Sequence, residues 1–189
     1  MNIKINQNMK DTNFTSIKPM KVLKEIQVSI TPKTNDFINR LSNTRSEDII
    51  KFLQESTKNI KIRDEKAKLF HKDNLLFYLS DGPSSYMLEQ NLGFVDKFAH
   101  SPKVVKYLQL GDEEFLTILI GDTEKLTPIN RCIDRITNVQ KQEFKNNMAQ
   151  LAKSGIVNNE IAANKDPLFF AESSKKILYG DWSNISFKK

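Results

Sequence analysis

The sequence predicts an α+β fold, in which helices and strands follow one another as separate blocks along the chain. Apolar residues recur with helical spacing over 46–58, 86–100 and 131–154. Short runs of β-branched and aromatic residues between charged turns predict strands over 59–80. The stretch 103–122 joins two such runs through a Gly–Asp turn, which is the pattern of a β-hairpin. The blocks therefore run as helices, strands, helix, hairpin and helix.

The composition is typical of a globular chain with a modest core. Hydrophobic residues make up 39% and charged residues 28% of the 189 residues, and this length suits one domain with or without a tail. The net charge of +6 favours acidic partners such as phosphates, nucleic acid or anionic lipid. A coding bias toward Lys explains the same excess, and both explanations stay open. The basic residues are scattered and form no stripe, so the sequence carries no nucleic-acid-binding signature.

Cysteine and histidine offer no metal site. The single cysteine, Cys132, excludes a disulfide within the chain and a cysteine-based zinc site, and we interpret it as a small buried residue. His71 and His100 do not have the spacing of metal ligands, and we expect each at the surface or in a loop.

The N-terminal segment is predicted to be a disordered tail over 1–20, because it is polar and lacks periodicity. It contains no apolar segment of the kind that a secretory signal peptide requires. Its composition fits both an ordinary tail and an unstructured export signal. Nowhere in the chain does an apolar run approach the ~18 residues that a membrane helix needs.

A small α/β extension is predicted over 21–57. It consists of a strand over 24–30 and helices over 34–43 and 46–58. Ser46 is the expected N-cap of the second helix, because the acidic residues that follow it suit a first helical turn. The buried stripe of this helix is expected to contain Ile49, Ile50 and Leu53.

The predicted central part, 58–122, holds strands over 59–63, 67–71 and 74–80, then a break at 81–85. A helix over 86–100 follows, and after it comes the hairpin. The buried face of this helix is expected to carry Leu88, Leu92, Val95 and Ala99.

The predicted C-terminal part, 123–189, begins with a linker over 123–130. A helix over 131–154 follows, and Gly155 is the expected stop. Two short extended segments come next, and the second leads into "YGDW", which contains the only Trp, Trp182. We expect Trp182 to be buried.

This order of elements resembles a protein kinase, with 58–122 in place of the N-lobe and 123–189 in place of a reduced C-lobe. "KVVKYLQLGDEEFLTILIGD" resembles the fourth and fifth strands that lead into the hinge. "FKNNMAQLAKSGIVNNEIAANKDPLFF" resembles the C-lobe helix and the catalytic loop, and "KKILYGDWSNI" resembles the strand before the D-F-G motif. The small type III secreted effector kinases of Gram-negative pathogens are the most similar group, and the resemblance covers about 58–187. It implies a minimal protein-kinase-like fold with a reduced C-lobe.

The resemblance also implies a set of site residues. Asp181 matches the metal-binding Asp, and Glu160 falls where the family has its catalytic Asp. Asn164 or Asp166 falls near the position of the second metal ligand, with a spacing that differs by about one residue. Glu89 matches the helix glutamate that pairs with the phosphate-anchoring lysine. Each residue also has a simpler interpretation: Asp181 as a turn residue after a glycine, Glu160 as a solvated loop residue, and Glu89 as a surface residue.

Three features depart from the kinase pattern. The third strand, "NLLFYLS", contains no lysine and has Tyr78 or a neighbour in that place. The stretch "IRDEKAK" lacks the glycines that let a loop approach phosphates closely. Trp182 and Ser183 replace the Phe and Gly of the D-F-G motif.

The implied function is that of a secreted bacterial effector that acts on a host protein. If active, it would be a Ser/Thr-type protein kinase that uses ATP and Mg²⁺. Asp181 would hold the magnesium, Glu160 would orient the acceptor hydroxyl, and Glu89 would position a phosphate-binding cation. Delivery into the host cell would not depend on a signal peptide, and a protein without such delivery would remain in the cytoplasm.

Two alternatives stay open at this point. The missing lysine and glycines favour a catalytically dead, pseudokinase-like module that binds a protein as an effector or an immunity protein. The net charge favours a small basic protein of mobile-element origin that binds an acidic partner. The sequence determines neither the oligomeric state nor the target.

Overall fold

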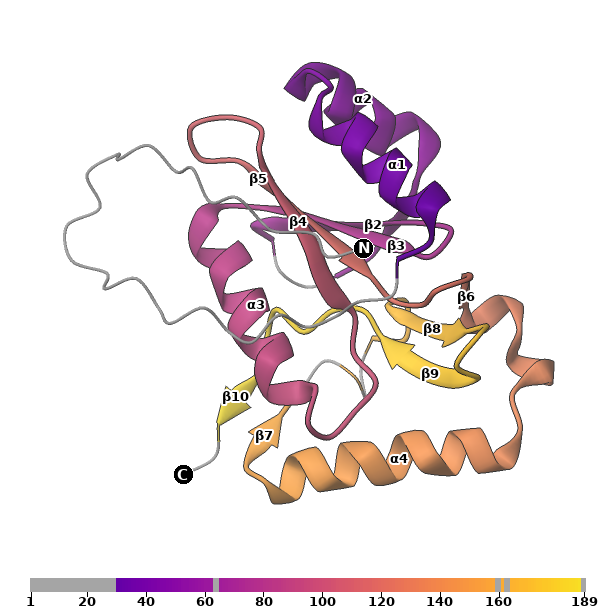
Figure 1. Cartoon of the computed structure of the whole chain (residues 1–189). Coiled ribbons are helices and arrows are strands. Elements are labelled where there is room, and N and C mark those ends of the chain that lie inside the picture. Colours follow the sequence, from indigo (N-terminus) through magenta and orange to yellow (C-terminus); the bar gives the residue numbers. More distant parts are fainter. Residues whose placement is uncertain (1–29, 63–64, 159–160, 162–163, 188–189) are drawn as a thin grey trace.

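The first two helices form a pair at one end of the molecule (Figure 1). The structure is a computed structural model that describes residues 30–62, 65–158, 161 and 164–187. Helix α1 spans Pro32–Ser42 and α2 spans Ser46–Ser56, which confirms both expected helices. The expected strand over 24–30 and the tail over 1–20 fall outside the described residues, except for Ile30.

Ser46 is not the N-cap that the sequence predicts. Arg45 occupies the cap position with an extended backbone, and its side chain makes no cap hydrogen bond. Ser46 is already the first helical residue, so its hydroxyl is not placed to accept from the third residue of the helix. The Arg45 guanidinium instead reaches the Asp48 carboxylate at 3.0 Å.

The central element is a five-stranded antiparallel sheet with the order β1-β2-β3-β5-β4. Its strands are β1 (Lys58–Ile60), β2 (Ala67–Lys72), β3 (Leu75–Ser80), β4 (Lys103–Gln109) and β5 (Phe115–Ile120). The pairing of β4 with β5 confirms the predicted hairpin, whose turn closes through the bond from the Leu110 amide to the Glu114 carbonyl at 2.9 Å.

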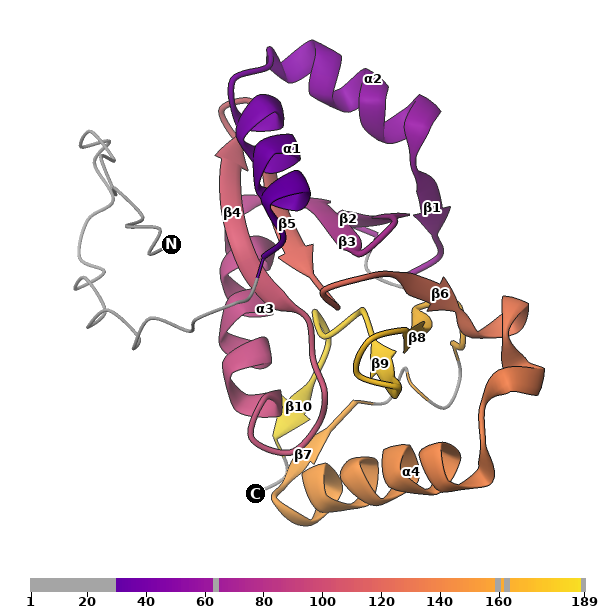
Figure 2. The same ribbon diagram turned by 45° about the vertical axis from the view of Figure 1, so that its right-hand side comes forward.

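The two faces of the sheet are covered by different helices (Figure 2). Side chains alternate along β3, so Phe77 faces α1 and α2 while Leu76 and Tyr78 face the opposite side. The layer under α1 and α2 contains the buried residues Ile38, Leu41, Ile49, Leu53, Phe70, Leu75, Phe77, Leu79, Leu116, Ile118 and Ile120.

Helix α3 (Gly82–Val95) packs against the second face of the sheet. It begins where the sequence predicted a break, because the Asp81 carboxylate accepts from the Ser84 amide at 2.8 Å and caps the helix. Proline in the first turn is compatible with this start. The expected buried face is confirmed, although the helix ends at Val95 and not at residue 100.

The C-terminal part starts with a strand inside the predicted linker, β6 (Leu126–Pro128). Two 3-10 turns follow, and α4 spans Asn138–Lys153, so the helix begins later than the periodicity predicts. Thr137 caps α4, and this cap fixes the start. Gly155 has φ 84°, a left-handed conformation that glycine adopts without strain, which confirms the expected stop.

Four short strands complete the chain: β7 (Ile156–Val157), β8 (Leu168–Ala171), β9 (Lys176–Tyr179) and β10 (Ser186–Phe187). Strands β6, β8 and β9 form an antiparallel sheet, and β7 pairs with β10. The three-stranded sheet lies between the large sheet and α4 in both views (Figures 1 and 2). The α+β class is thus confirmed, and the order of the elements is the one expected from a kinase-like chain.

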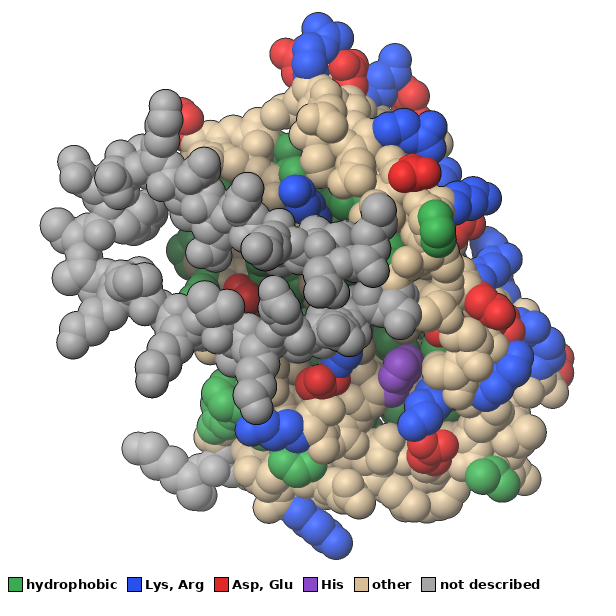
Figure 3. All heavy atoms as spheres, in the orientation of Figure 1, with side chains coloured by type: hydrophobic (Ala, Val, Ile, Leu, Met, Phe, Trp, Pro, Cys, Tyr) green, Lys and Arg blue, Asp and Glu red, His purple; other side chains and the backbone are tan. Residues whose placement is uncertain are grey.

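A single hydrophobic cluster joins the large sheet to the C-terminal part. It includes Leu69, Leu76 and Tyr78 of the sheet, Leu88 and Leu92 of α3, and Phe169, Leu178, Tyr179 and Trp182 of the C-terminal part. On the outside, Figure 3 shows Lys and Arg side chains interspersed with Asp and Glu down the right-hand side, in agreement with the scattered charges of the sequence. Among the described residues, no helix has both the length and the apolar character to span a membrane.

Candidate functional site

Asp181 lies two residues after the end of β9, where the chain leaves the three-stranded sheet. The residue is buried, with 4% of its surface exposed. Its Oδ1 accepts from the Ser183 amide at 3.2 Å and from the Ser183 hydroxyl at 2.5 Å. The carboxylate therefore shapes the turn that follows it, which is the simpler of its two sequence interpretations. Its expected role as a metal ligand stays a prediction.

Trp182 is buried, as expected, with only 1% of its surface exposed. The indole Nε1 donates to the Tyr179 carbonyl at 2.8 Å, and the two rings meet edge to face at 5.4 Å. Asn91 of α3 donates from Nδ2 to the carbonyls of Trp182 and Ser183, at 2.8 and 3.1 Å. The turn that contains Asp181 is thereby fixed to the helix that packs on the sheet.

Glu89 lies half-buried on α3 and interacts with Tyr107 of β4. Burial raises the pKa of the Tyr107 hydroxyl first, and the charge of Glu89 and their mutual hydrogen bond raise it further. Tyr78, with 1% of its surface exposed, occupies the middle of β3 on the face toward α3. Strand β3 contains no lysine that could reach Glu89.

The segment after β7 is described only in part. Glu160 lies outside the described residues, so its expected role stays a prediction. Asn158 donates from Nδ2 to the Asp181 carbonyl at 3.3 Å, which brings the start of this segment to the turn after β9. Asn164 donates to the Lys61 carbonyl at 2.8 Å, and its Oδ1 accepts from the Asp166 amide at 3.1 Å. The Asn164 amide thus bonds to backbone groups through both of its polar atoms.

Side chains fill part of the space where a nucleotide would lie. A nucleotide held by magnesium on Asp181, with its phosphates under the β1–β2 connection, would lie between the large sheet and the β8–β9 hairpin. There His71 of β2 packs on Phe169 of β8, with ring centroids 4.8 Å apart. Two surfaces must separate by about 7 Å to admit a flat ring, because carbon atoms pack at 3.5–4.0 Å. The contact of His71 with Phe169 therefore leaves no room for a flat ring between these two side chains.

Gly180 shows how closely the large sheet and the β8–β9 hairpin approach each other. A Cβ atom at this position would lie 3.0 Å from Leu76 Cδ1, 3.1 Å from Phe169 Cε2 and 3.4 Å from the Pro167 carbonyl oxygen. His71 is part of the same contact and has 8% of its surface exposed, which corrects its expected place at the surface or in a loop. Burial lowers the pKa of the His71 imidazole. Strand β3 and the β8–β9 hairpin are thus in direct van der Waals contact.

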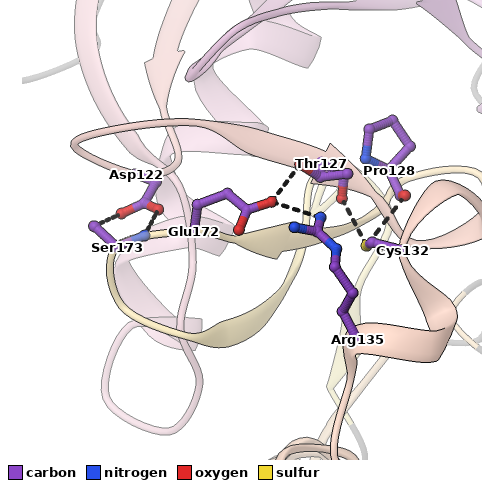
Figure 4. A network of polar contacts seen from close by, with 7 residues as sticks. All are labelled: Asp122, Thr127, Pro128, Cys132, Arg135, Glu172 and Ser173. Atoms are coloured by element: carbon purple, nitrogen blue, oxygen red, sulfur yellow. Dashed lines mark hydrogen bonds and ion pairs between the residues drawn. The ribbon is translucent and has the colours of Figure 1, made fainter.

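The carboxylate of Asp122 connects the segment after β5 to the turn between β8 and β9 (Figure 4). It accepts from the Ser173 amide at 2.7 Å, from the Ser173 hydroxyl, and from the Thr123 amide at 2.8 Å. Asn74 adds a bond from Nδ2 to the Asp122 carbonyl at 3.1 Å. Asp122 therefore ties the part of the chain that resembles a hinge to the hairpin below it.

Glu172 makes a second connection beside the first (Figure 4). Its Oε1 accepts from the Thr127 hydroxyl at 2.6 Å and from Arg135 Nη2 at 2.8 Å. The hydrogen bond from Thr127, and then the Arg135 guanidinium, lower the pKa of the Glu172 carboxyl. Cys132 is buried beside this pair, and burial raises the pKa of its thiol, in agreement with its expected structural role.

No group of three or more His, Cys, Asp or Glu side chains that could hold a metal ion occurs in the part of the chain that the structure describes. Two residues that shape the site, Asn91 and Phe169, are not identified as site residues by the sequence pattern. Asn91 had one usable signal: it is a polar residue next to Leu92 on the buried side of an amphipathic helix, where a side-chain hydrogen bond is expected.

No protein-family model matches the chain, and no curated protein matches its sequence. Solved structures of WbdD match with 10% identity, one of them in complex with a kinase inhibitor. Their TM-scores are 0.40 and 0.43, and they cover 68% and 70% of this chain. The kinase PK-1 of the Cydia pomonella granulovirus matches with 12% identity and a TM-score of 0.39, over 75% of this chain.

This chain spans 33% and 34% of the two WbdD chains and 56% of the granulovirus kinase chain. Likenesses of this remoteness assign neither a family nor an activity. The kinase-like order of elements is instead visible in the chain itself: five antiparallel strands with a helix between the third and fourth, then a helix and a hairpin that ends at Tyr179, two residues before Asp181.

Proposed function

We propose that this chain is a kinase-like module that acts by binding a partner protein and not by transferring phosphate. The observation that carries the proposal is the contact of His71 and Leu76 with the β8–β9 hairpin, where a nucleotide would have to lie. A binding module needs only a stable surface, whereas a kinase needs room for ATP between its two parts.

The residues that would bind the phosphates of a nucleotide support the same proposal. Phosphoryl transfer depends on a lysine that the αC-type glutamate positions on the phosphates. Here β3 contains no lysine, and Glu89 interacts with Tyr107. The connection between β1 and β2 contains no glycine, which limits how closely its amides approach a phosphate.

The partner that we propose is a protein of a host cell, in line with the resemblance to secreted effectors. Residues 1–20, which lie outside the described residues, would carry the export signal. A translocation assay on the full chain, with and without residues 1–20, checks this part of the proposal, and equal delivery of both would contradict it.

Phosphoryl transfer by the same module is the second candidate. It is favoured by the position of Asp181, which is buried at the end of β9, and by the contact that Asn158 makes with it. In the family that the chain resembles, these two segments carry the metal-binding Asp and the catalytic loop.

A thermal-shift measurement with Mg²⁺ and ATP tests whether the chain binds a nucleotide, which phosphoryl transfer requires. A ligand at a hundredfold excess over Kd stabilises the native state by about 2.7 kcal/mol. We expect no Mg²⁺-dependent rise in the Tm of the wild type with ATP or ADP, while an active kinase in the same assay shows one. The control variant is Asp181→Asn, whose side-chain oxygen still accepts from Ser183. A rise in the wild type that Asp181→Asn abolishes would establish a Mg²⁺-dependent nucleotide site at Asp181 and contradict the filled nucleotide space, and autophosphorylation with labelled ATP would then decide between a nucleotide-binding module and a kinase.

A further inference from the structure

We propose that a basic groove beside β1 and β6 binds an extended acidic segment of the partner protein. This inference rests on the proposed function in one respect, that the partner is a protein. The groove has a volume of about 420 Å³. The end of β2 and the start of β1 form one wall, and the stretch from Lys125 through β6 to Arg131 forms the other. A volume of this size accommodates several side chains or a drug-sized ligand.

The charge of the groove is strongly positive. Lys58, Lys72, Lys125 and Arg131 line it, against a single carboxylate, that of Asp73. The ion pairs of the described residues lie elsewhere, and none of them involves these four cations, although Lys72 Nζ donates to the Ser56 carbonyl at 3.1 Å and lies 5.5 Å from the Phe52 ring centroid. Closely spaced cations without a carboxylate partner produce a positive potential that attracts an anionic segment and speeds its association.

The positive charge is local and not a consequence of the net charge alone. A second hollow, of about 350 Å³, lies at the far ends of β2 and β3 and has the opposite character. It contains four carboxylates, those of Glu65, Asp81, Glu113 and Glu114, against two lysines. One end of the sheet therefore suits an acidic ligand and the other does not.

The groove also offers main-chain partners to an extended segment. Strand β1 is the outermost strand of the large sheet and is the edge that faces an incoming segment, whereas at β6 the Leu126 amide already donates to the Asp73 carbonyl at 2.9 Å and Pro128 has no amide. An edge strand presents amide and carbonyl groups that an incoming extended chain can pair with. Acidic side chains on one face of such a chain would meet the lysines and the arginine of the groove.

The lining residues favour an acidic protein over a nucleic acid. Single-stranded nucleic acids bind through exposed aromatic rings on which their bases stack. The aromatic ring in this groove, that of His71, is packed on Phe169, and its Nε2 donates to the Asp73 carbonyl at 2.9 Å. The N-terminal residues of the same chain are unsuitable occupants, because 1–29 carry five lysines against Asp11 and Glu25.

The test uses the full chain and a short fluorescein-labelled peptide in which Glu and Thr alternate, with a Lys–Thr peptide as its control. Fluorescence anisotropy is measured for the wild type, for the double variant Lys58→Glu/Arg131→Glu, and for Lys141→Glu/Lys145→Glu. The last variant makes the same change of net charge on the exposed side of α4. We expect the groove variant to bind the Glu–Thr peptide about tenfold more weakly, since each exposed ion pair contributes up to ~1 kcal/mol.

The α4 variant is expected to bind like the wild type, and added salt is expected to weaken wild-type binding more than binding by the groove variant. Equal losses in the two variants would overturn the inference, because net charge alone would then explain binding. Tighter binding of a thymidine oligonucleotide at the same groove would overturn it in favour of a nucleic acid. Salt-sensitive self-association that only the groove variant lacks would show a second copy as the occupant. The proposed function is tested separately: it would be contradicted by a Mg²⁺- and ATP-dependent rise in Tm, whatever the peptide measurement shows.

Discussion

Gly180 lies where the large sheet and the β8–β9 hairpin approach each other, and the space beside it is already occupied. Its amide donates to the Pro167 carbonyl at 2.8 Å, which holds the chain between β9 and Asp181 in place. Leu76 and Phe169 fill the side on which a Cβ atom would project. Glycine is required at this position because of packing.

The first prediction follows from this contact. Gly180→Ala is expected to lower the free energy of unfolding by about 1–3 kcal/mol, the usual cost of inserting a methyl group into a packed core. The measurement is urea denaturation followed by far-UV circular dichroism. Gly93→Ala is the matched control: Gly93 lies in α3 with nothing within 4 Å of its Cβ position. That variant is expected to be more stable by about 0.5–1 kcal/mol, because Ala favours the helix. A Gly180→Ala variant as stable as the wild type would mean that the sheet and the hairpin are not in contact.

Single residues show which parts of the candidate site the sequence can predict. Asp181 was located from the motif order, but its contact with Ser183 and the support from Asn91 depend on residues far apart in the chain. The packing of His71 on Phe169, which fills part of the nucleotide space, was not predictable, because the two residues lie 98 positions apart in the chain. No local pattern in the sequence records such a contact.

Helix α4 depends strongly on its own sequence. Only Leu151 of its residues is fully buried, while Phe144 and Met148 are half-buried against the neighbouring clusters, so most of its surface is exposed. Its N-terminus carries a capping box: the Gln140 amide donates to the Thr137 hydroxyl at 3.3 Å, and the Gln140 side chain accepts from the Thr137 amide at 2.9 Å. These bonds satisfy two amides that would otherwise lack partners at the helix start.

Thr137→Ala is therefore expected to lower the free energy of unfolding by about 1 kcal/mol, measured by urea denaturation. Ser46→Ala is the control at the start of α2, where the sequence suggested a cap and the structure shows none. It is expected to change stability by less than about 0.5 kcal/mol. The opposite result, with Ser46→Ala the more damaging of the two, would restore Ser46 as a cap.

The helices also show why element limits are harder to predict than element types. Periodicity identified the helices that became α2, α3 and α4, but each limit depends on a cap. Asp81 starts α3 inside a stretch whose Gly and Pro predicted a break, and Thr137 starts α4 well after its first apolar residue. A cap is a geometric relation between a side chain and one amide, and Gly or Pro nearby is compatible with either outcome.

At the scale of the whole molecule, one hydrophobic cluster runs from the sheet and α3 into the C-terminal part. Asp122 reinforces this connection from the side through hydrogen bonds to Ser173 that span the two parts, while Glu172 joins β6 to the end of β8 within the C-terminal part. A chain with such a shared core is expected to unfold as one unit.

Trp182 allows a direct measurement of this cooperativity, because it is the only Trp and is buried in the C-terminal part of the shared cluster. We expect its fluorescence and the far-UV circular dichroism of the whole chain to report the same urea midpoint. The same coincidence is expected in the stabilised variant Gly93→Ala, with both midpoints shifted upward together. A fluorescence transition at a lower urea concentration than the circular dichroism transition would show that the C-terminal part unfolds by itself.

The sequence by itself determined the α+β class, the order of the elements, the hairpin over 103–122 and the helix stop at Gly155, because these depend on local periodicity and on turn residues. The tertiary structure alone decided that β3 and the β8–β9 hairpin meet, that Glu89 interacts with Tyr107, and that four cations gather at one groove. Packing brings together residues that are distant in the chain, and a single sequence contains no record of those distances.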